Sequence, residues 1–171
     1  MNYATIKYYD IANGPGVRTS LFVSGCNHHC KGCFNEEAQD FNYGRPFTKE
    51  VEDEIITTLR NGLTILGGEP MEIENAKCLV TFLERVRVLR PDLSIWIYTG
   101  FTWEELMARK KEEKDIVMRI FHVIDILVDG RFVENLKDIT LQFRGSSNQR
   151  IIDVQKTLNS NDIVIWDKLR K

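Results

Sequence analysis

The stretch TSLFVSGCNHHCKGCFN, residues 19–35, runs from an apolar segment directly into three closely spaced cysteines. The segment at 19–25 is typical of a strand that ends at a glycine. The cysteines follow with the spacing C-x3-C-x2-C, at Cys26, Cys30 and Cys33. A strand therefore delivers three thiols to one loop, and this loop is the first candidate for a functional site.

Length and charge limit the number of domains and the kinds of partner that the chain can bind. The chain has 171 residues, 43% of them hydrophobic and 28% charged, which suffices for one substantial core. We expect one domain over 1–171, with 154–171 as a C-terminal extension of unassigned role. The net charge of −2 and the pI near 6.0 provide no surplus of Lys and Arg for nucleic acid or an anionic membrane.

The sequence also lacks the usual signals for export or membrane insertion. No apolar run approaches the roughly 20 residues that cross a bilayer, and MNYATIKYYD has no apolar signal-peptide core. We therefore expect a cytoplasmic protein. In a reducing cytoplasm, its four cysteines are expected to be metal ligands or free thiols rather than disulfides.

Apolar runs alternate with helical patterns along the chain. After 19–25, we expect strands at 63–68, 94–100, 124–130, 140–145 and 162–167. We expect helices at 48–61, 74–90 and 116–123, and a further one from Thr102 with Glu105 in a capping box. This alternation predicts an α/β fold whose mostly parallel sheet is covered by helices. A complete eight-fold barrel takes about 250 residues, so the shorter chain predicts a partial, open β/α barrel with one edge free for a large partner.

Short motifs follow several of these expected strands. The cysteines follow 19–25, and the motif GGEP begins at Gly67. YTG ends at Gly100, and DGR begins at Asp129. Functional residues in parallel sheets lie at the carboxyl ends of the strands, so we expect these motifs to meet in one site.

The three thiols leave two kinds of metal centre open. A structural zinc ion needs a fourth tight ligand, for which His28, His29 or Cys78 are the candidates. A four-iron cluster held by three thiolates instead keeps one iron without a protein ligand. Gly25 and Gly32 would let the backbone approach either centre closely.

The flanking motifs carry a resemblance to a known family. C-x3-C-x2-C followed by an aromatic residue resembles the signature of the radical S-adenosylmethionine superfamily. The stretch from Asp10 to Asn35, with LTILGGEP, IWIYTGF, ILVDGRF and FRGSSNQRIID, resembles the activating proteins of anaerobic (class III) ribonucleoside-triphosphate reductases. The resemblance extends in order to about residue 153. One departure is Glu69, where many members carry Asp.

This resemblance implies a cofactor set and a reaction. Cys26, Cys30 and Cys33 would bind three irons of a [4Fe-4S] cluster, and S-adenosylmethionine would occupy the fourth iron. Reductive cleavage of S-adenosylmethionine would generate a glycyl radical on the reductase catalytic subunit. Reduced flavodoxin is the implied electron donor, and a partial barrel of the radical S-adenosylmethionine type is the implied fold.

Further residues take cofactor-binding roles by the same resemblance, and each has a structural alternative. Gly67 and Gly68 would offer carbonyls to the cofactor ammonium, or form an ordinary turn. Glu69 would orient that ammonium or structure the loop. Gly32, Cys33 and Phe34 would border the cofactor, with Phe34 beside adenine or in the core. Asp129 and Arg131 would hold ribose hydroxyls and carboxylate, or form a surface ion pair.

The remaining motifs are less decisive. Arg18 would contact the partner or fix its own loop, and Gly14–Gly16 would form a turn. Ser146, Ser147 and Asn148 form a polar loop suited to cofactor or partner contact, whereas His122 is expected in the core. Other functions stay open: an activase of another glycyl-radical enzyme, such as pyruvate formate-lyase, a small radical enzyme that acts on free metabolites, and a zinc-stabilised interaction module.

Overall fold

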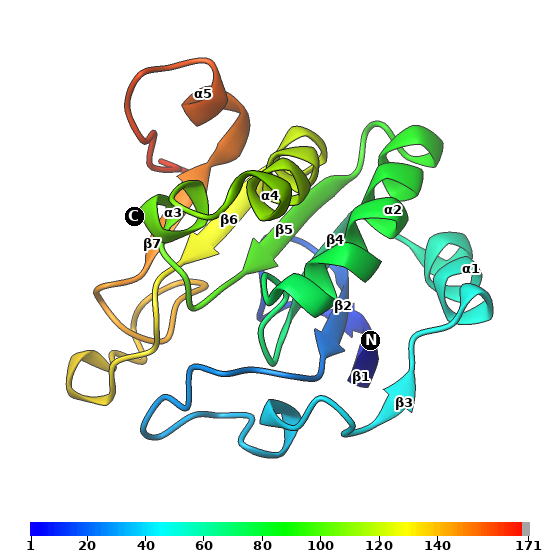
Figure 1. Cartoon of the computed structure of the whole chain (residues 1–171), viewed down its shortest axis with the longest axis horizontal. Coiled ribbons are helices and arrows are strands. Elements are labelled where there is room, and N and C mark those ends of the chain that lie inside the picture. Colours follow the sequence, from blue (N-terminus) through cyan, green and yellow to red (C-terminus); the bar gives the residue numbers. More distant parts are fainter. Residues whose placement is uncertain (169–171) are drawn as a thin grey trace.

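A computed structural model describes residues 1–168, which form one seven-stranded sheet flanked by helices (Figure 1). The sheet order is β3-β1-β2-β4-β5-β6-β7. In chain order the strands are β1 (Asn2–Asp10), β2 (Arg18–Val23), β3 (Arg45–Pro46), β4 (Gly62–Gly67), β5 (Ser94–Tyr98), β6 (Ile126–Asp129) and β7 (Arg150–Asp153). The helices are α1 (Lys49–Thr58), α2 (Ile73–Leu89), α3 (Trp103–Met107), α4 (Lys111–Val123) and α5 (Val154–Leu158), with short 3-10 turns η1 (Glu37–Gln39) and η2 (Glu134–Leu136).

The sheet is open and mostly parallel, as the alternation of strands and helices predicts. The central strands β2, β4, β5 and β6 pair in parallel, and β1 and β7 run antiparallel to their inner neighbours. Since β3 is antiparallel to β1, it runs in the direction of the central strands. The sheet begins at β3 and ends at β7 without closing into a barrel.

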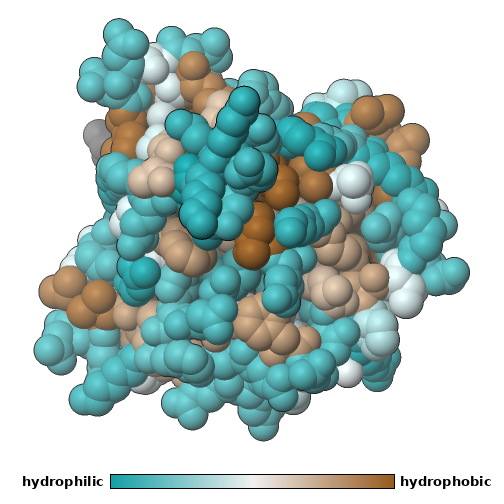
Figure 2. Space-filling model, in the orientation of Figure 1, coloured by the Kyte–Doolittle hydropathy of each residue, from teal (hydrophilic) through white to brown (hydrophobic). Residues whose placement is uncertain are grey.

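The two faces of the sheet carry different packing, because side chains alternate along each strand. One face contributes Leu21, Val23, Leu63, Ile65, Ile95, Ile97, Leu127 and Ile152 to the main core beneath α2 and α4. The other face carries a smaller cluster around Trp96, which Trp166 from the C-terminal segment joins. In the orientation of Figure 1, hydrophilic residues cover most of the outer surface and hydrophobic side chains show in smaller patches (Figure 2).

Several expected elements agree with the structure. Strand expectations at 19–25, 63–68, 94–100 and 124–130 correspond to β2, β4, β5 and β6, with boundaries shifted by a few residues. The capping box at α3 is confirmed: the backbone N–H of Glu105 donates to the Thr102 hydroxyl at 3.2 Å, and the backbone N–H of Thr102 donates to the Glu105 carboxylate at 2.7 Å.

Other expectations are wrong for identifiable reasons. Residues 140–145 form turns rather than a strand, because Phe143 has φ 57° and an extended strand requires negative φ. Residues 162–167 contribute only an isolated bridge, between Ile165 and Ile152. His122 is exposed rather than in the core, because it follows the inward-facing Ile120 and Phe121 onto the outer side of α4.

Strands β1 and β7, and the two-residue β3, were not expected from the sequence. β1 alternates buried or half-buried positions with exposed ones, and its polar side chains hide the strand pattern. β7 lies inside the motif FRGSSNQRIID, next to the misassigned run at 140–145. Within residues 1–168, no helix is both long enough and apolar enough to span a membrane.

Candidate iron-sulfur and cofactor site

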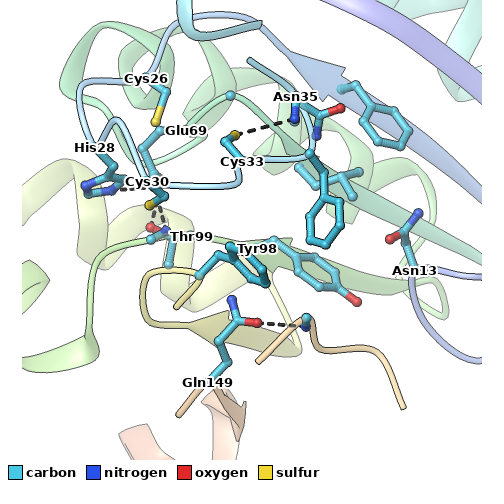
Figure 3. Close-up of a pocket in the computed structure, with 18 of the residues that line it drawn as sticks. Asn13, Cys26, His28, Cys30, Cys33, Asn35, Glu69, Tyr98, Thr99 and Gln149 are labelled. Carbon is cyan, nitrogen blue, oxygen red and sulfur yellow. Dashed lines mark hydrogen bonds and ion pairs between the residues drawn. The ribbon is translucent and has the colours of Figure 1, made fainter. Parts of the chain in front are cut away.

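A cavity of about 500 Å³ lies where the parallel strands end, and all three clustered cysteines line it (Figure 3). The loop after β2 contributes Cys26, Cys30, Cys33 and Phe34, and the end of β4 contributes Gly67, with Gly68 and Glu69 following it. Residues after β5 and β6 complete the wall, among them Thr99, Gly100, Gly130 and Phe132. The structure therefore brings residues of the cysteine, GGEP and YTG motifs together, but of the DGR motif only Gly130 lines the cavity.

The cysteine loop leaves β2 along a path that excludes side chains at its first turn. Gly25 has φ 97°, and a β-carbon on it would come within 2.2 Å of the Phe41 ring. The backbone N–H groups of Gly25 and Cys26 donate to the carbonyls of Ala38 and Gln39 at 2.8 and 3.0 Å. The segment around η1 thus fixes the start of the loop.

The thiols of Cys26 and Cys30 are held in surroundings that disfavour their ionisation. Burial raises the pKa of Cys26 to about 11, and the nearby Glu69 carboxylate contributes to the increase. Burial also raises the pKa of Cys30. The backbone N–H of Asn35 donates to the sulfur of Cys33 at 3.4 Å. Binding of a metal centre would therefore displace protons from these thiols, which makes its affinity pH-dependent.

The donor set fits a cluster better than a single ion. In the described part of the chain, no three His, Cys, Asp or Glu side chains are arranged to hold one metal ion. The candidate fourth ligands have other contacts: His28 Nε2 lies 2.9 Å from Glu69, and His29 Nδ1 lies 2.8 Å from Gln39. Cys78 lies in α2 and packs against the main core. Three thiols that line one cavity match the cysteine ligation of iron-sulfur clusters.

The Gly-Gly turn packs directly against the cysteine loop. Gly67 has φ 109°, and a β-carbon on Gly68 would come within 2.7 Å of the Gly25 carbonyl oxygen. The backbone N–H groups of Gly68 and Glu69 donate to the carbonyls of Val23 and Gly25 at 2.7 and 2.8 Å. These contacts give both glycines a packing role, alongside any role of their carbonyls in binding a cofactor.

Glu69 is almost fully buried, with 1% exposure, and its carboxylate accepts hydrogen bonds from four groups. Oε1 accepts from the backbone N–H of Met71 and from the Thr99 hydroxyl, both at 2.7 Å. Oε2 accepts from the backbone N–H of Gly100 at 2.6 Å and lies 2.9 Å from His28 Nε2. The carboxylate therefore joins the ends of β4 and β5 to the cysteine loop.

Asp129 ends β6 and Arg131 follows it, but neither lines the cavity. Asp129 is 1% exposed, and its carboxylate accepts from Arg150 at 3.0 and 2.5 Å and from the backbone N–H of Trp103 at 2.8 Å. Arg131 forms an ion pair with Glu105 at 2.9 Å. A role for either residue in holding the cofactor would require these partners to be shared or exchanged.

Phe34 lies at the rim of the cavity and is 65% exposed. Its ring packs against Phe132, with 4.9 Å between the ring centroids, and Lys137 Nζ lies 5.2 Å from the Phe34 centroid. Gly32 has φ 70° but is not among the cavity-lining residues. Phe34 is therefore a rim residue rather than part of the core.

The less decisive motifs have structural contacts. Arg18 is 1% exposed and donates to the Thr64 hydroxyl and to the carbonyls of Leu63 and Ser94 at 2.8 to 2.9 Å. It thus ties together the starts of β2, β4 and β5, so its burial favours the loop-fixing alternative. Ser146 accepts from the backbone N–H of Val133 at 3.2 Å, and Asn148 donates to the Arg131 carbonyl at 2.9 Å.

Sequence reasoning missed several residues around the site. Tyr98, Phe132, Arg144 and Gln149 line the cavity. Tyr98 and Phe132 belong to the quoted motifs IWIYTGF and ILVDGRF, which is the signal that could have found them. Arg150 was missed as the partner of Asp129, because a pair separated by 21 positions has no local pattern.

Comparisons with known proteins agree with this geometry. A family model described as a 4Fe-4S single cluster domain matches residues 12–152. The anaerobic ribonucleoside-triphosphate reductase-activating protein of Escherichia coli K12 is 43% identical over 155 residues, covering 87% of this chain and 96% of the relative. The proteins of the same name from Vibrio cholerae and phage T4 are 41% and 33% identical; each match covers 88% of this chain, and 97% and 93% of the relative. The chain therefore belongs to the family of anaerobic ribonucleoside-triphosphate reductase-activating proteins.

Proposed function

We propose that this chain is an activating enzyme that generates a glycyl radical on an anaerobic ribonucleoside-triphosphate reductase. The observation that carries the proposal is the placement of Cys26, Cys30 and Cys33 around one cavity with the Gly67-Gly68 turn. Membership of the activating-protein family supplies the target, because the relatives are named for that reductase. The match to a 4Fe-4S domain supplies the metal centre.

Cys26, Cys30 and Cys33 would hold three irons of a [4Fe-4S] cluster at the cavity that Gly67 and Gly68 also line, and the fourth iron would be left for S-adenosylmethionine. When bound, the cluster and S-adenosylmethionine would supply the one-electron radical chemistry that removes a hydrogen atom from a reductase glycine. The chain's own part is to bind the cofactors, orient them and exclude water.

Individual residues divide this work. The carbonyls of Gly67 and Gly68 would accept from the cofactor ammonium, and Phe34 at the rim would cover the adenine. Glu69 would act by fixing the strand ends, because protein donors already occupy both of its oxygens. The open sheet would correspond to a partial barrel of the radical S-adenosylmethionine type, and its open side would admit the reductase glycine.

Reduced flavodoxin is the electron donor that we propose, and a reducing cytoplasm would keep the three thiols available for the cluster. The alternatives are weaker. The relatives are named for the ribonucleotide reductase rather than for another glycyl-radical enzyme. A zinc module lacks support from the ligand geometry within residues 1–168.

The test is anaerobic reconstitution of the full chain with iron and sulfide. We expect brown protein with about four irons per chain, reductive formation of 5'-deoxyadenosine, and a glycine-centred doublet in the electron paramagnetic resonance (EPR) spectrum after the reductase is added. Cys26→Ala should abolish the last two. A colourless protein that retains one zinc ion and releases no 5'-deoxyadenosine would refute the proposal.

A further inference from the structure

His28 lies between Cys26 and Cys30 in the cysteine loop and lines the same cavity as the three thiols. Its side chain is 7% exposed, and Nε2 lies 2.9 Å from Glu69 Oε2 (Figure 3). A carboxylate oxygen only accepts hydrogen bonds, so Nε2 carries the hydrogen in this contact. The adjacent His29 is exposed and contacts Gln39 instead. Two neighbouring histidines of one loop therefore have different environments.

The surroundings of His28 are shaped to hold its ring in place. The ring packs edge-on against Phe101, with 4.4 Å between the centroids. A β-carbon on Gly100 would come within 2.5 Å of His28 Cδ2 and 2.7 Å of Nε2. The absence of a side chain at position 100 thus makes room for the imidazole. Gly100 also donates its backbone N–H to the same Glu69 oxygen that His28 contacts.

The contact between His28 and Glu69 connects several segments of the site, because the Glu69 carboxylate also binds residues that follow β5. Backbone hydrogen bonds tie the first part of the loop to the β4 end, through the carbonyls of Val23 and Gly25. The contact between the His28 ring and Glu69 also ties the stretch between Cys26 and Cys30 to the end of β4. This stretch leads to the second thiol, that of Cys30. The Thr99 hydroxyl and the Gly100 backbone hold the other side of the carboxylate. One side-chain contact therefore links the thiol-bearing loop to two strand ends.

We propose that His28 is a positioning residue, which through Glu69 sets the distance between the cysteine loop and the Gly67-Gly68 turn. This inference rests on the proposed function, in which one cofactor bridges the cluster and that turn. Three thiolates suffice to retain the cluster without His28. Binding of S-adenosylmethionine requires the cluster and the Gly67-Gly68 turn at a fixed distance from each other. The His28–Glu69 contact maintains that distance.

The experiment compares full-length variants that are reconstituted anaerobically. His28→Asn removes the contact, and His29→Asn is the matched control, since Asn tolerates the positive φ of 48° at position 29. His28→Gln restores a donor of similar reach. Gly100→Ala leaves both histidines intact but displaces the His28 ring by steric overlap. Circular dichroism confirms that each variant folds, and iron content, affinity for S-adenosylmethionine and the EPR spectrum of the reduced cluster are measured.

We expect His28→Asn and Gly100→Ala to retain the iron content of the unaltered protein but to bind S-adenosylmethionine roughly 10- to 100-fold more weakly. The change that S-adenosylmethionine produces in the EPR spectrum should be reduced in the same two variants. His28→Gln should recover most of the affinity, and His29→Asn should match the unaltered protein.

Two results would overturn the inference. Affinity within twofold of the unaltered protein in both His28→Asn and Gly100→Ala would show that the contact does not position the loop. Loss of iron in folded His28→Asn would make His28 a ligand rather than a positioning residue. Failure of the proposed function gives a different result, because the unaltered protein itself would then show no response to S-adenosylmethionine.

Discussion

Trp166 provides a test of whether the C-terminal segment belongs to the folded domain. The segment lies beyond residue 152, where the match to the 4Fe-4S domain ends. Trp166 is nevertheless 9% exposed and packs edge-on against Trp96, with 5.1 Å between the ring centroids. Its backbone N–H donates to the Ile151 carbonyl at 2.8 Å. Trp166→Ala should therefore destabilise the folded domain, although Trp166 lies far along the chain from its packing partner Trp96.

The magnitude follows from the buried area. A tryptophan side chain buries about 200 Å², which at about 25 cal/mol per Å² corresponds to about 5 kcal/mol. The unfolded chain already buries part of this surface, which reduces the value by about 10–40%, and the segment can relax around the smaller side chain. We expect a loss of about 3 kcal/mol in the free energy of unfolding, or about 6–12 °C in Tm for a chain of this size.

Thermal unfolding, followed by circular dichroism under anaerobic conditions, measures the effect. Ile165→Ala is the matched control, because Ile165 is the neighbouring residue and is 52% exposed. Its cost should stay below about 1 kcal/mol. If Trp166→Ala melts within a degree of the unaltered protein, the segment does not pack on Trp96 and the reasoning is refuted.

Three further predictions address the site and its surroundings. Gly68→Ala should weaken S-adenosylmethionine binding at least tenfold in a calorimetric titration, because its β-carbon would push the turn away from the Gly25 carbonyl; unchanged affinity would contradict the packing at this turn. Cys78→Ser should leave the iron content unchanged in a colorimetric assay, since Cys78 packs against the core and does not line the cavity; loss of one iron would instead make it a ligand. The hydrogen bond from Arg150 lowers the pKa of Glu104 to about 2, so the carboxylate contributes stability that is present above its ordinary pKa of 4.5 and is lost as the pH falls toward 2. Glu104→Gln should therefore lower the free energy of unfolding at neutral pH by less than about 1 kcal/mol. Urea titrations at several pH values should also show that this free energy depends less on pH between about 4.5 and 2 than in the unaltered protein. An unchanged pH dependence would mean that the ion pair does not contribute.

The central part of the fold was predictable because its signals are local. The strands β2, β4, β5 and β6 are largely buried, so each contains a short apolar run with a glycine at or shortly after its end. The edges gave weaker signals. Strand β1 mixes polar and apolar residues. In the apolar run at 140–145, Phe143 has a left-handed backbone conformation that the residue type does not predict.

The candidate site divides in the same way. The spacing of the cysteines and the glycine at each strand exit predicted which motifs would meet. The partners of individual side chains were not predictable, since they come from distant positions. Glu69 contacts His28 and Thr99, which are 41 and 30 positions away. Burial of Arg18 likewise depends on strand starts that only the assembled sheet brings together.

The central claim is that the chain binds three irons of a four-iron cluster and leaves the fourth to S-adenosylmethionine. Mössbauer spectroscopy of protein reconstituted with ⁵⁷Fe, recorded with and without S-adenosylmethionine, tests it most directly. We predict that one iron site of the cluster changes its isomer shift when S-adenosylmethionine is added, while the other three do not. A spectrum in which all four sites are unaffected, or in which no cluster is present, would contradict the account.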